Sequence, residues 1–333
     1  MQIDIKTNNV RPIRQTFAHV ARRLGTDKPA SRYQEATLDL QAETNFHYRP
    51  LWDPDHELFD PARTAIRMQD WYAFKDPRQY YYGTWTIARA RQQDSMERNF
   101  SFVEKRALLD NLSAAWRDRV AGVMIPLRHV EYAANLNNTF ITAYGYGTAF
   151  TQTTSFAAMD HLGIAQYLSR IGLLLDGNSG EALDAAKQAW MADPAWQPLR
   201  ELVEEMLTIR DWFELYVAQS YALDGLLYPL IYQRFDNALS ASGGSAVAML
   251  TEFMVDWFAE NCRCVDAFLK TAASESDANR KQLSHWARNW SARAAKALKP
   301  VADKALGEDA VAVMAELQTE LQTRGARQCG LEI

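Results

Sequence analysis

The spacing of apolar residues constrains the fold of this sequence more than any other feature. From about residue 83 onward, apolar side chains recur three and four positions apart, which places them on one face of an α-helix. One such stripe consists of Val120, Val123, Met124, Leu127, Val130 and Ala134. The 15 glycines and 11 prolines in 333 residues are too few for the frequent turns of an all-β fold. The pattern therefore predicts an all-α protein.

Turn residues divide the periodic part into separate helices. The pair Gly243 and Gly244 ends one helix, and Pro198 suits the first position of another. Gly225 and Pro229 are expected to kink the helix that follows Pro198. Helices are predicted over residues 117–142, 148–175, 179–191 and 198–237, over about 25 residues after Gly244, and over 277–299 and 308–323.

The beginning of the chain has a different character. Six of the 11 prolines fall within the first 77 residues, and the aromatic residues between them follow no regular period. We therefore expect an extended, Pro- and aromatic-rich N-terminal arm over residues 1–77 and a helical domain over residues 78–333. The arm has apolar surface to bury. Two places for it stay open, namely the helical body of the same chain and a partner subunit.

Composition excludes several classes of function. The 36 Lys and Arg against 41 Asp and Glu give a net charge of −5, which leaves no cationic excess for a nucleic-acid partner. The N-terminal region has no apolar signal-peptide core, and no apolar run approaches the roughly 20 residues of a membrane span. The three cysteines include Cys262 and Cys264, which are too close for an ordinary bridge. We expect a soluble, cytoplasmic protein with reduced thiols and no membrane partner.

Common catalytic and nucleotide-binding motifs do not occur in the sequence. The strings GxxxxGK[ST], GxGxxG and GxSxG are all missing. His47, Asp53, Asp55, His56 and Glu57 bring metal-ligand residue types into one short stretch of the arm. Prolines place this stretch in loops, so we favour local pairing of these side chains, or pairing with a partner, over a metal site.

A bundle of long helices raises the question of a di-iron centre. Such centres take one glutamate from each of two helices and a Glu-x-x-His pair from each of two others. The residues three positions before the six histidines are Thr16, Thr44, Asp53, Pro126, Ala158 and Gln282. None of them is a glutamate, so this chain cannot supply the usual ligand set.

Several long strings closely resemble one protein family. They are DKPASRYQEA, NFHYRPLWDP, RTAIRMQDWYAFKDPRQYYYGTW, QYLSRIGLLLDG, RDWFEL and GGSAVAMLTEFMVDW. These strings resemble the β subunit, the small hydroxylase chain, of bacterial multicomponent phenol hydroxylases, which belong to the di-iron toluene and phenol monooxygenases. The resemblance runs from about residue 5 to about residue 300. NFHYRPLWDP and QYLSRIGLLLDG are similar to the phenol type rather than the toluene type.

The resemblance implies a ferritin-like helical bundle with a structural function. It implies a partner α subunit that carries the di-iron centre, a small γ subunit, and a dimer of αβγ trimers. It also implies a regulatory protein and an NADH-dependent reductase with FAD and a 2Fe-2S cluster. The complex would hydroxylate phenol with NADH and O₂, while this chain would hold no active site, cofactor or metal. Under this interpretation the aromatic residues of the arm and those from Trp71 to Trp85 anchor interfaces, with core packing as the alternative.

Similarity to the catalytic paralogue also assigns former metal-ligand positions. They are Glu131 in VEYAAN, His161 and Ile164 in MDHLGIAQ, Glu214 in RDWFEL, and Glu260 and Arg263 in AENCRC. An arginine cannot coordinate iron, but its cation can neutralise a leftover carboxylate. A buried network of Glu-Arg and Glu-His pairs can then occupy the pocket. For Glu131 and Glu214, an ordinary solvated helix face is the alternative.

Two other classes of function stay open on the sequence alone. A stand-alone helical oxygenase would need a non-standard metal site built from His129, Glu131, His161, Glu214 and Glu260. A helical protein-binding module would need none of these residues.

Overall fold

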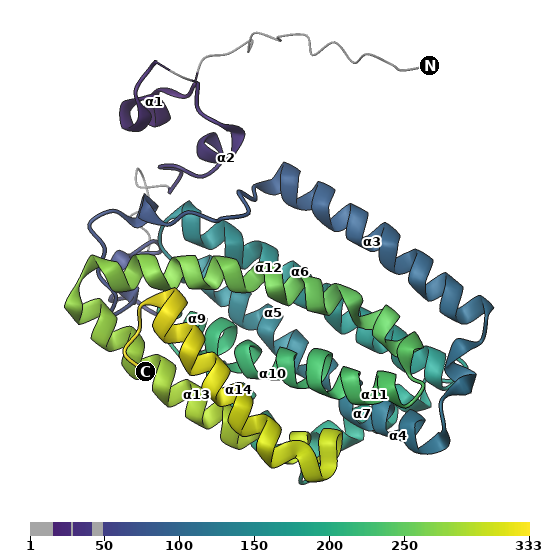
Figure 1. Ribbon diagram of the computed structural model, residues 1–333. Helices are drawn as coiled ribbons and strands as arrows, with labels where there is room; N and C mark the ends of the chain where they lie inside the picture. The colour runs from purple at the N-terminus through teal and green to yellow at the C-terminus, as the bar shows by residue number, and fades with distance from the viewer. Residues whose placement is uncertain (1–15, 28, 42–48) are drawn as a thin grey trace, which may run out of the picture.

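The computed structural model describes residues 16–27, 29–41 and 49–333. Within these ranges every regular element is helical, which confirms the predicted all-α fold (Figure 1). The α-helices are α1 (Ala18–Leu24), α2 (Arg32–Glu35), α3 (Tyr82–Lys105), α4 (Ala114–Met124), α5 (Leu127–Tyr144), α6 (Thr148–Leu175), α7 (Glu181–Ala192), α8 (Gln197–Met206), α9 (Trp212–Tyr216), α10 (Asp224–Pro229), α11 (Asp236–Ala241), α12 (Ser245–Glu275), α13 (Asp277–Leu306) and α14 (Ala310–Arg324). None of the helices in the described ranges is long and apolar enough to cross a membrane.

Proline divides one helix that the apolar pattern predicts as continuous. The stripe over residues 117–142 belongs to two helices, α4 and α5, which meet at Ile125 and Pro126. Pro126 has no N–H with which to continue the hydrogen-bond ladder of α4, and it stands as the N-cap of α5. Residues 148–175, by contrast, form the single helix α6, as predicted.

A capping aspartate divides a second predicted helix. The stretch 198–237 is interrupted after α8, and the chain enters a helix again at α9. Asp211 Oδ1 accepts hydrogen bonds from the backbone N–H groups of Phe213 and Glu214, at 2.9 and 3.1 Å. These bonds satisfy donors that have no partner inside the helix, so they fix the first turn of α9.

The helices α9, α10 and α11 form one continuous helix with two wider turns. Val217–Leu223 and Leu230–Phe235 are π-helical, so their backbone hydrogen bonds reach one residue farther than in an α-helix. The second π turn directly follows Pro229, whose ring has no N–H for the α-helical pattern. A Cβ atom at Gly225 would lie 2.8 Å from Leu321 Cδ1, so this glycine allows α14 to approach closely.

We call the continuous helix made of α9, α10 and α11 the long helix. The bundle core lies between the antiparallel pair of α5 and α6 on one side and the long helix and α12 on the other. Asn135 Nδ2 of α5 donates to the carbonyl oxygen of Ala158 in α6 at 2.7 Å, which fixes their register. Figure 1 shows α12 in green crossing in front of α6, with α13 and α14 on the outside of the long helix. Aromatic rings fill one end of the core. The ring of Phe150 lies 5.2 Å from that of Phe213 and 4.9 Å from that of Phe268.

Aromatic residues just before and within the start of α3 complete this core. Phe74 is fully buried, and its ring centroid lies 5.3 Å from that of Phe150. Trp85 stacks on Phe156 of α6 at 5.0 Å, and Trp71 is buried as well. The prediction that the tryptophans of this stretch anchor an interface is therefore wrong. The alternative, core packing, holds because their rings fill space that the long helices leave open.

Farther upstream, the arm contains short helices that its irregular pattern did not predict. Ser31 and Gln34 form a reciprocal capping box at the start of α2. Arg23 of α1 forms ion pairs with Asp39 at 2.7 Å and with Asp70 at 2.5 Å, so its guanidinium connects α1 to the segment before α3. These polar contacts help to hold the described parts of the arm together.

Candidate functional site

Three helices of the bundle contribute to one buried polar cluster, and a fourth, α12, packs against it. Glu131 comes from α5, His161 from α6, and Asp224 and Tyr228 from α10, and we call these four residues the interior cluster. His161 Nδ1 lies 2.6 Å from Glu131 Oε2, and both side chains are 1% exposed. Tyr228 Oη donates to Glu131 from 3.0 Å. The ring of Trp257 in α12 meets the imidazole edge-on, with ring centroids 4.7 Å apart.

Charge is distributed asymmetrically within the interior cluster. Burial alone would lower the pKa of His161, but the hydrogen bond and negative charge of Glu131 outweigh it, and this pKa is raised. Burial also raises the pKa of Asp224 to about 7. His161 Nε2 and Asp224 Oδ2 lie 3.7 Å apart, and neither atom has a hydrogen-bond partner in the described part of the chain. The arrangement favours an imidazolium paired with Glu131 and flanked by a carboxyl group that readily keeps its proton.

Two amides hold Asp224 in place. Asn137 Nδ2 of α5 donates to Gln219 Oε1 at 2.9 Å, and Gln219 Nε2 donates to Asp224 Oδ1 at 2.7 Å. Gln219 belongs to the first π turn, so the wider turn brings this amide within reach of Asp224. Sequence reasoning missed both amides. The signal for Asn137 was a polar residue on the inward stripe of an amphipathic helix.

The interior cluster does not fit a di-iron centre. Such a centre needs four carboxylates and two imidazoles, whereas here one imidazole and two carboxyl groups face each other. Ile164, the former histidine position, is a fully buried apolar side chain. Among residues 16–27, 29–41 and 49–333, no group of three or more His, Cys, Asp and Glu is arranged to hold a metal ion.

Three other residues singled out in the sequence lie away from the interior cluster. Glu214 is half-buried and accepts a hydrogen bond from Trp290 Nε1 of α13 at 3.0 Å. Glu260 points from α12 toward α3 and pairs with Arg89 of that helix and with Arg78 of the segment before it. Arg263 is exposed, so the prediction that it neutralises an interior carboxylate is wrong. One residue farther along α12, Cys264 occupies the buried position.

His129 is also separate from the interior cluster. Its ring stacks on that of Trp190 in α7, with centroids 5.7 Å apart. The ligand types that a non-standard metal site would draw together are therefore distributed over several places in the described structure.

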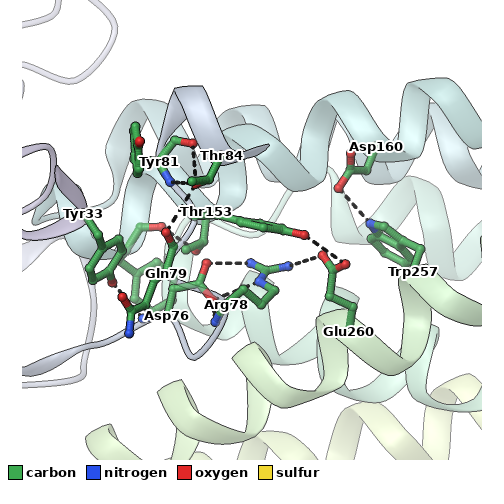
Figure 2. Close-up of polar contacts among 12 residues, drawn as sticks. Tyr33, Asp76, Arg78, Gln79, Tyr81, Thr84, Thr153, Asp160, Trp257 and Glu260 are labelled. Atoms are coloured by element: carbon green, nitrogen blue, oxygen red, sulfur yellow. Dashed lines mark hydrogen bonds and ion pairs between the residues drawn. The ribbon is translucent and has the colours of Figure 1, made fainter. Parts of the chain in front are cut away.

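A second cluster joins α3 to the bundle. Arg89 of α3 donates from Nε and Nη2 to the two oxygens of Asp160 in α6, both at 2.7 Å. The same Nη2 lies 2.9 Å from Oε1 of Glu260. Trp257 Nε1 donates to Asp160 Oδ2 at 2.9 Å, as Figure 2 shows. We call Arg89, Asp160 and Glu260 the α3 cluster.

The α3 cluster extends into the segment before α3. Figure 2 shows Arg78 between Asp76 and Glu260, with Nε 2.9 Å from Asp76 Oδ1 and Nη1 3.5 Å from Glu260 Oε1. Tyr33 of α2 accepts a hydrogen bond from the N–H of Asp76 at 2.8 Å. The buried Glu-Arg pairs of this protein thus form with Arg78 and Arg89, which sequence reasoning did not select. No short motif marks them, because they are distant in sequence from Glu260.

The metal-ligand residue types of the arm are His47, Asp53, Asp55, His56 and Glu57. Asp53 Oδ1 lies 2.9 Å from His56 Nδ1, and Asp53 Oδ2 forms an ion pair with Arg63. The hydrogen bond from His56, together with Arg63, lowers the pKa of Asp53. This is the local pairing that we favoured for the arm. His47 lies outside the described residues.

A family model and two curated proteins match this chain over most of its length. The family model, described as Methane/Phenol/Alkene Hydroxylase, matches residues 52–276. The chain is 55% identical over 324 residues to the oxygenase component DmpL of phenol 2-monooxygenase from Pseudomonas sp. (strain CF600), with 97% of each chain covered. It is 54% identical over 311 residues to the oxygenase component MhpL from Acinetobacter pittii (strain PHEA-2), with 93% of each covered.

Solved structures match the fold as well. A chain of xenon-pressurized phenol hydroxylase from Pseudomonas sp. OX1 superposes with a TM-score of 0.92 at 48% identity, and 99% of each chain is covered. A chain of toluene 4-monooxygenase gives a TM-score of 0.77 at 18% identity, covering 92% of this chain and 99% of that one. The second match concerns the fold alone.

Proposed function

Because the chain belongs to the methane/phenol/alkene hydroxylase family, we propose that it is the β subunit of a multicomponent phenol hydroxylase. In this proposal the complex is an NADH- and O₂-dependent aromatic monooxygenase of the cytoplasm. A partner α subunit holds the di-iron centre, and a partner reductase holds FAD and a 2Fe-2S cluster. The γ subunit and a regulatory protein complete the system, and the oxygenase is a dimer of αβγ trimers. This chain supports the assembly and holds no catalytic, cofactor-binding or metal-binding residue.

The observation that carries the structural role is the ion pair inside the bundle. His161 Nδ1 and Glu131 Oε2 are in direct contact at 2.6 Å. Tyr228 Oη donates to the same carboxylate and lies 3.0 Å from each of its oxygens. His161 Nδ1 and the carboxylate of Glu131 are thus engaged with protein partners rather than free to bind a metal. They act to fix α5, α6 and α10 relative to one another, which keeps the outer faces of the bundle in a constant shape for partners.

The same proposal assigns a contact role to the N-terminal arm. Leu51 and Trp52 are strongly exposed on the surface of the chain, although large apolar side chains are normally buried. Residues 1 to about 60 are therefore proposed to contact a partner subunit, while Trp71 and Phe74 attach the arm to the chain's own core.

Iron content of the assembled oxygenase tests the proposal. The variant Glu131→Gln with His161→Gln removes both charges while keeping two side chains that can hydrogen-bond to each other. We expect the co-expressed complex to keep its full iron content per αβγ unit and a phenol turnover within a few fold of wild type. A complex of normal size that loses iron, or that keeps iron in this chain after separation of the subunits, would refute the structural role.

A further inference from the structure

The outer surface of α5 and α6 is unusually apolar. Tyr132 and Leu136 of α5 are 54% and 40% exposed, and Met159 and Leu162 of α6 are 54% and 41% exposed. The two pairs are neighbours, because the hydrogen bond from Asn135 to Ala158 lies between them. Large apolar side chains that gather in this way mark an interaction surface more often than isolated exposed ones do.

Charge is missing from the same surface. Residues 132–144 of α5 contain no Asp, Glu, Lys, Arg or His. Residues 148–169 of α6 contain only Asp160 and His161, and both are buried in the clusters described above. A helix that faces water normally carries charged residues on its outward stripe. Two adjacent stretches of helix without any charged side chain facing outward are typical of a surface that another protein covers.

The apolar surface continues onto the arm at one end. Phe140 lies one turn after Leu136, and its ring is 4.6 Å from that of Tyr144. Tyr144 Oη accepts a hydrogen bond from Trp52 Nε1 at 3.0 Å. Trp52 is 74% exposed and Leu51 is 95% exposed. We call the surface formed by Leu51, Trp52, Tyr132, Leu136, Phe140, Met159 and Leu162 the α5–α6 face.

A cationic groove borders the other end of the α5–α6 face. Arg128, Arg170 and Lys187 line it together with Leu162, and no carboxylate is among its lining residues. Arg170 pairs with Glu97 of α3 at 2.8 Å. Neither Arg128 nor Lys187 forms an ion pair within the described structure. The positive charge of these two residues is therefore available to an anionic partner.

Burial and the two cations beside His129 lower its pKa to about 4, so this histidine adds no charge of its own near neutral pH. Its Nε2 atom is buried without a hydrogen-bond partner in the described part of the chain. The charge of the groove thus comes from its arginine and lysine side chains and not from His129.

We propose that the α5–α6 face is the docking surface for the catalytic partner subunit, which covers it with an uncharged helical surface and places carboxylates in the cationic groove. This inference rests on the proposed function and adds to it a location and a chemical description of the partner. Apolar contact supplies most of the affinity at the centre of such an interface, and charge at its edge sets orientation.

A second copy of this chain is a poorer occupant. In a two-fold pair, the cationic groove of one copy meets either the same groove of the other copy or the arm end of its face. The arm end is lined by Arg63, Arg67 and Arg210 against Asp53 and Asp211. Cations would oppose cations in the first arrangement, and in the second the groove would meet a surface on which three arginines accompany only two carboxylates, whereas a partner with acidic flanks complements the groove.

Sedimentation velocity of the co-expressed oxygenase tests the docking surface. Leu162→Glu introduces a charge on the face, and Lys187→Glu reverses one in the groove. Both side chains are exposed, so the core stays unchanged. We expect each substitution to raise the concentration at which the complex dissociates by about tenfold or more, because like charge at an interface is costly. Val311→Glu on α14 and Lys296→Glu on α13, both exposed outside the face, are matched controls that should leave it unchanged.

The outcomes separate the docking surface from the function. Wild-type dissociation for both Leu162→Glu and Lys187→Glu, in a complex that hydroxylates phenol, would overturn the docking surface and leave the proposed function intact. Weakening confined to a contact between two copies of this chain, identified by cross-linking, would overturn it as well. Failure of the wild-type chain to associate with the catalytic subunit at all would refute both.

Discussion

Asp160 and His161 are consecutive residues of α6, yet their side chains enter two different charged clusters. Asp160 accepts from Arg89 of α3 at 2.7 Å, and His161 lies 2.6 Å from Glu131 of α5. Trp257 connects them, because its Nε1 donates to Asp160 while its ring contacts the imidazole. One turn of α6 therefore links the interior of the bundle to the outlying helix α3.

Removing Glu131 is expected to destabilise α6 strongly. Glu131→Leu leaves the buried His161 imidazolium without its anion, which costs about 3–5 kcal/mol. Adding His161→Leu should recover part of the loss, since apolar residues can replace a buried ion pair with little penalty. Peptide-resolved hydrogen exchange of α6 in the assembled oxygenase measures the opening free energy. A double variant that opens as easily as the single variant would contradict the ion pair.

The stability of the interior cluster should decrease as pH rises. The pKa of Asp224 is raised from 3.8 to about 7, so the folded state keeps a proton that the unfolded state has lost between these values. His161 acts in the same direction, because its pKa is higher in the folded state than in the unfolded state. The stabilisation that the His161–Glu131 pair gives is therefore complete below the pKa of the unfolded state and is lost as pH rises through the pKa of the folded state.

Asp224→Asn is therefore expected to reduce the loss of stability between about pH 4 and pH 7. The opening free energy of α10, followed by hydrogen exchange with correction for the intrinsic rate, checks this. Asp256→Asn, at an exposed position of α12, serves as the control and should leave the pH dependence unchanged. Equal pH slopes for wild type and Asp224→Asn would show that Asp224 is ionised throughout.

Glu214 is expected to act through one hydrogen bond. Glu214→Gln keeps an oxygen acceptor for Trp290 Nε1, so phenol turnover by the reconstituted complex should stay within a few fold. Glu214→Leu leaves that buried N–H without an acceptor, which costs about 1–3 kcal/mol. Turnover and melting are measured on the same samples. A Gln variant that assembles and melts normally yet hydroxylates nothing would place chemistry in this chain.

Arg89 is expected to hold α3 against the bundle. Arg89→Met leaves Asp160 and Glu260 close together without their shared cation, so α3 should detach and become sensitive to limited proteolysis. Arg89→Lys should give an intermediate result, because an ammonium cannot match both carboxylates as the planar guanidinium does. Arg91→Met, at an exposed position of the same helix, is the control. Cleavage at wild-type rates in Arg89→Met would contradict this role.

Periodicity predicted the helices whose packing is uniform along their length, such as α6. It failed where a single residue decides a boundary, as at Pro126, whose ring ends α4, and at Asp211, whose carboxylate starts α9. The site was harder to predict for a different reason. Which side of α12 faces the interior depends on tertiary packing, and the sequence alone did not show that Glu260 meets α3 while Arg263 faces water.

The two π turns of the long helix determine which side chains beyond them face the interior of the bundle. If Val217–Leu223 kept its residues but adopted α-helical turns, everything beyond would rotate by about 100°. Asp224 and Tyr228 would then leave Glu131 and His161 and face a neighbouring helix. The number of residues in this helix is therefore matched to its two wider turns as closely as its buried side chains are matched to the core.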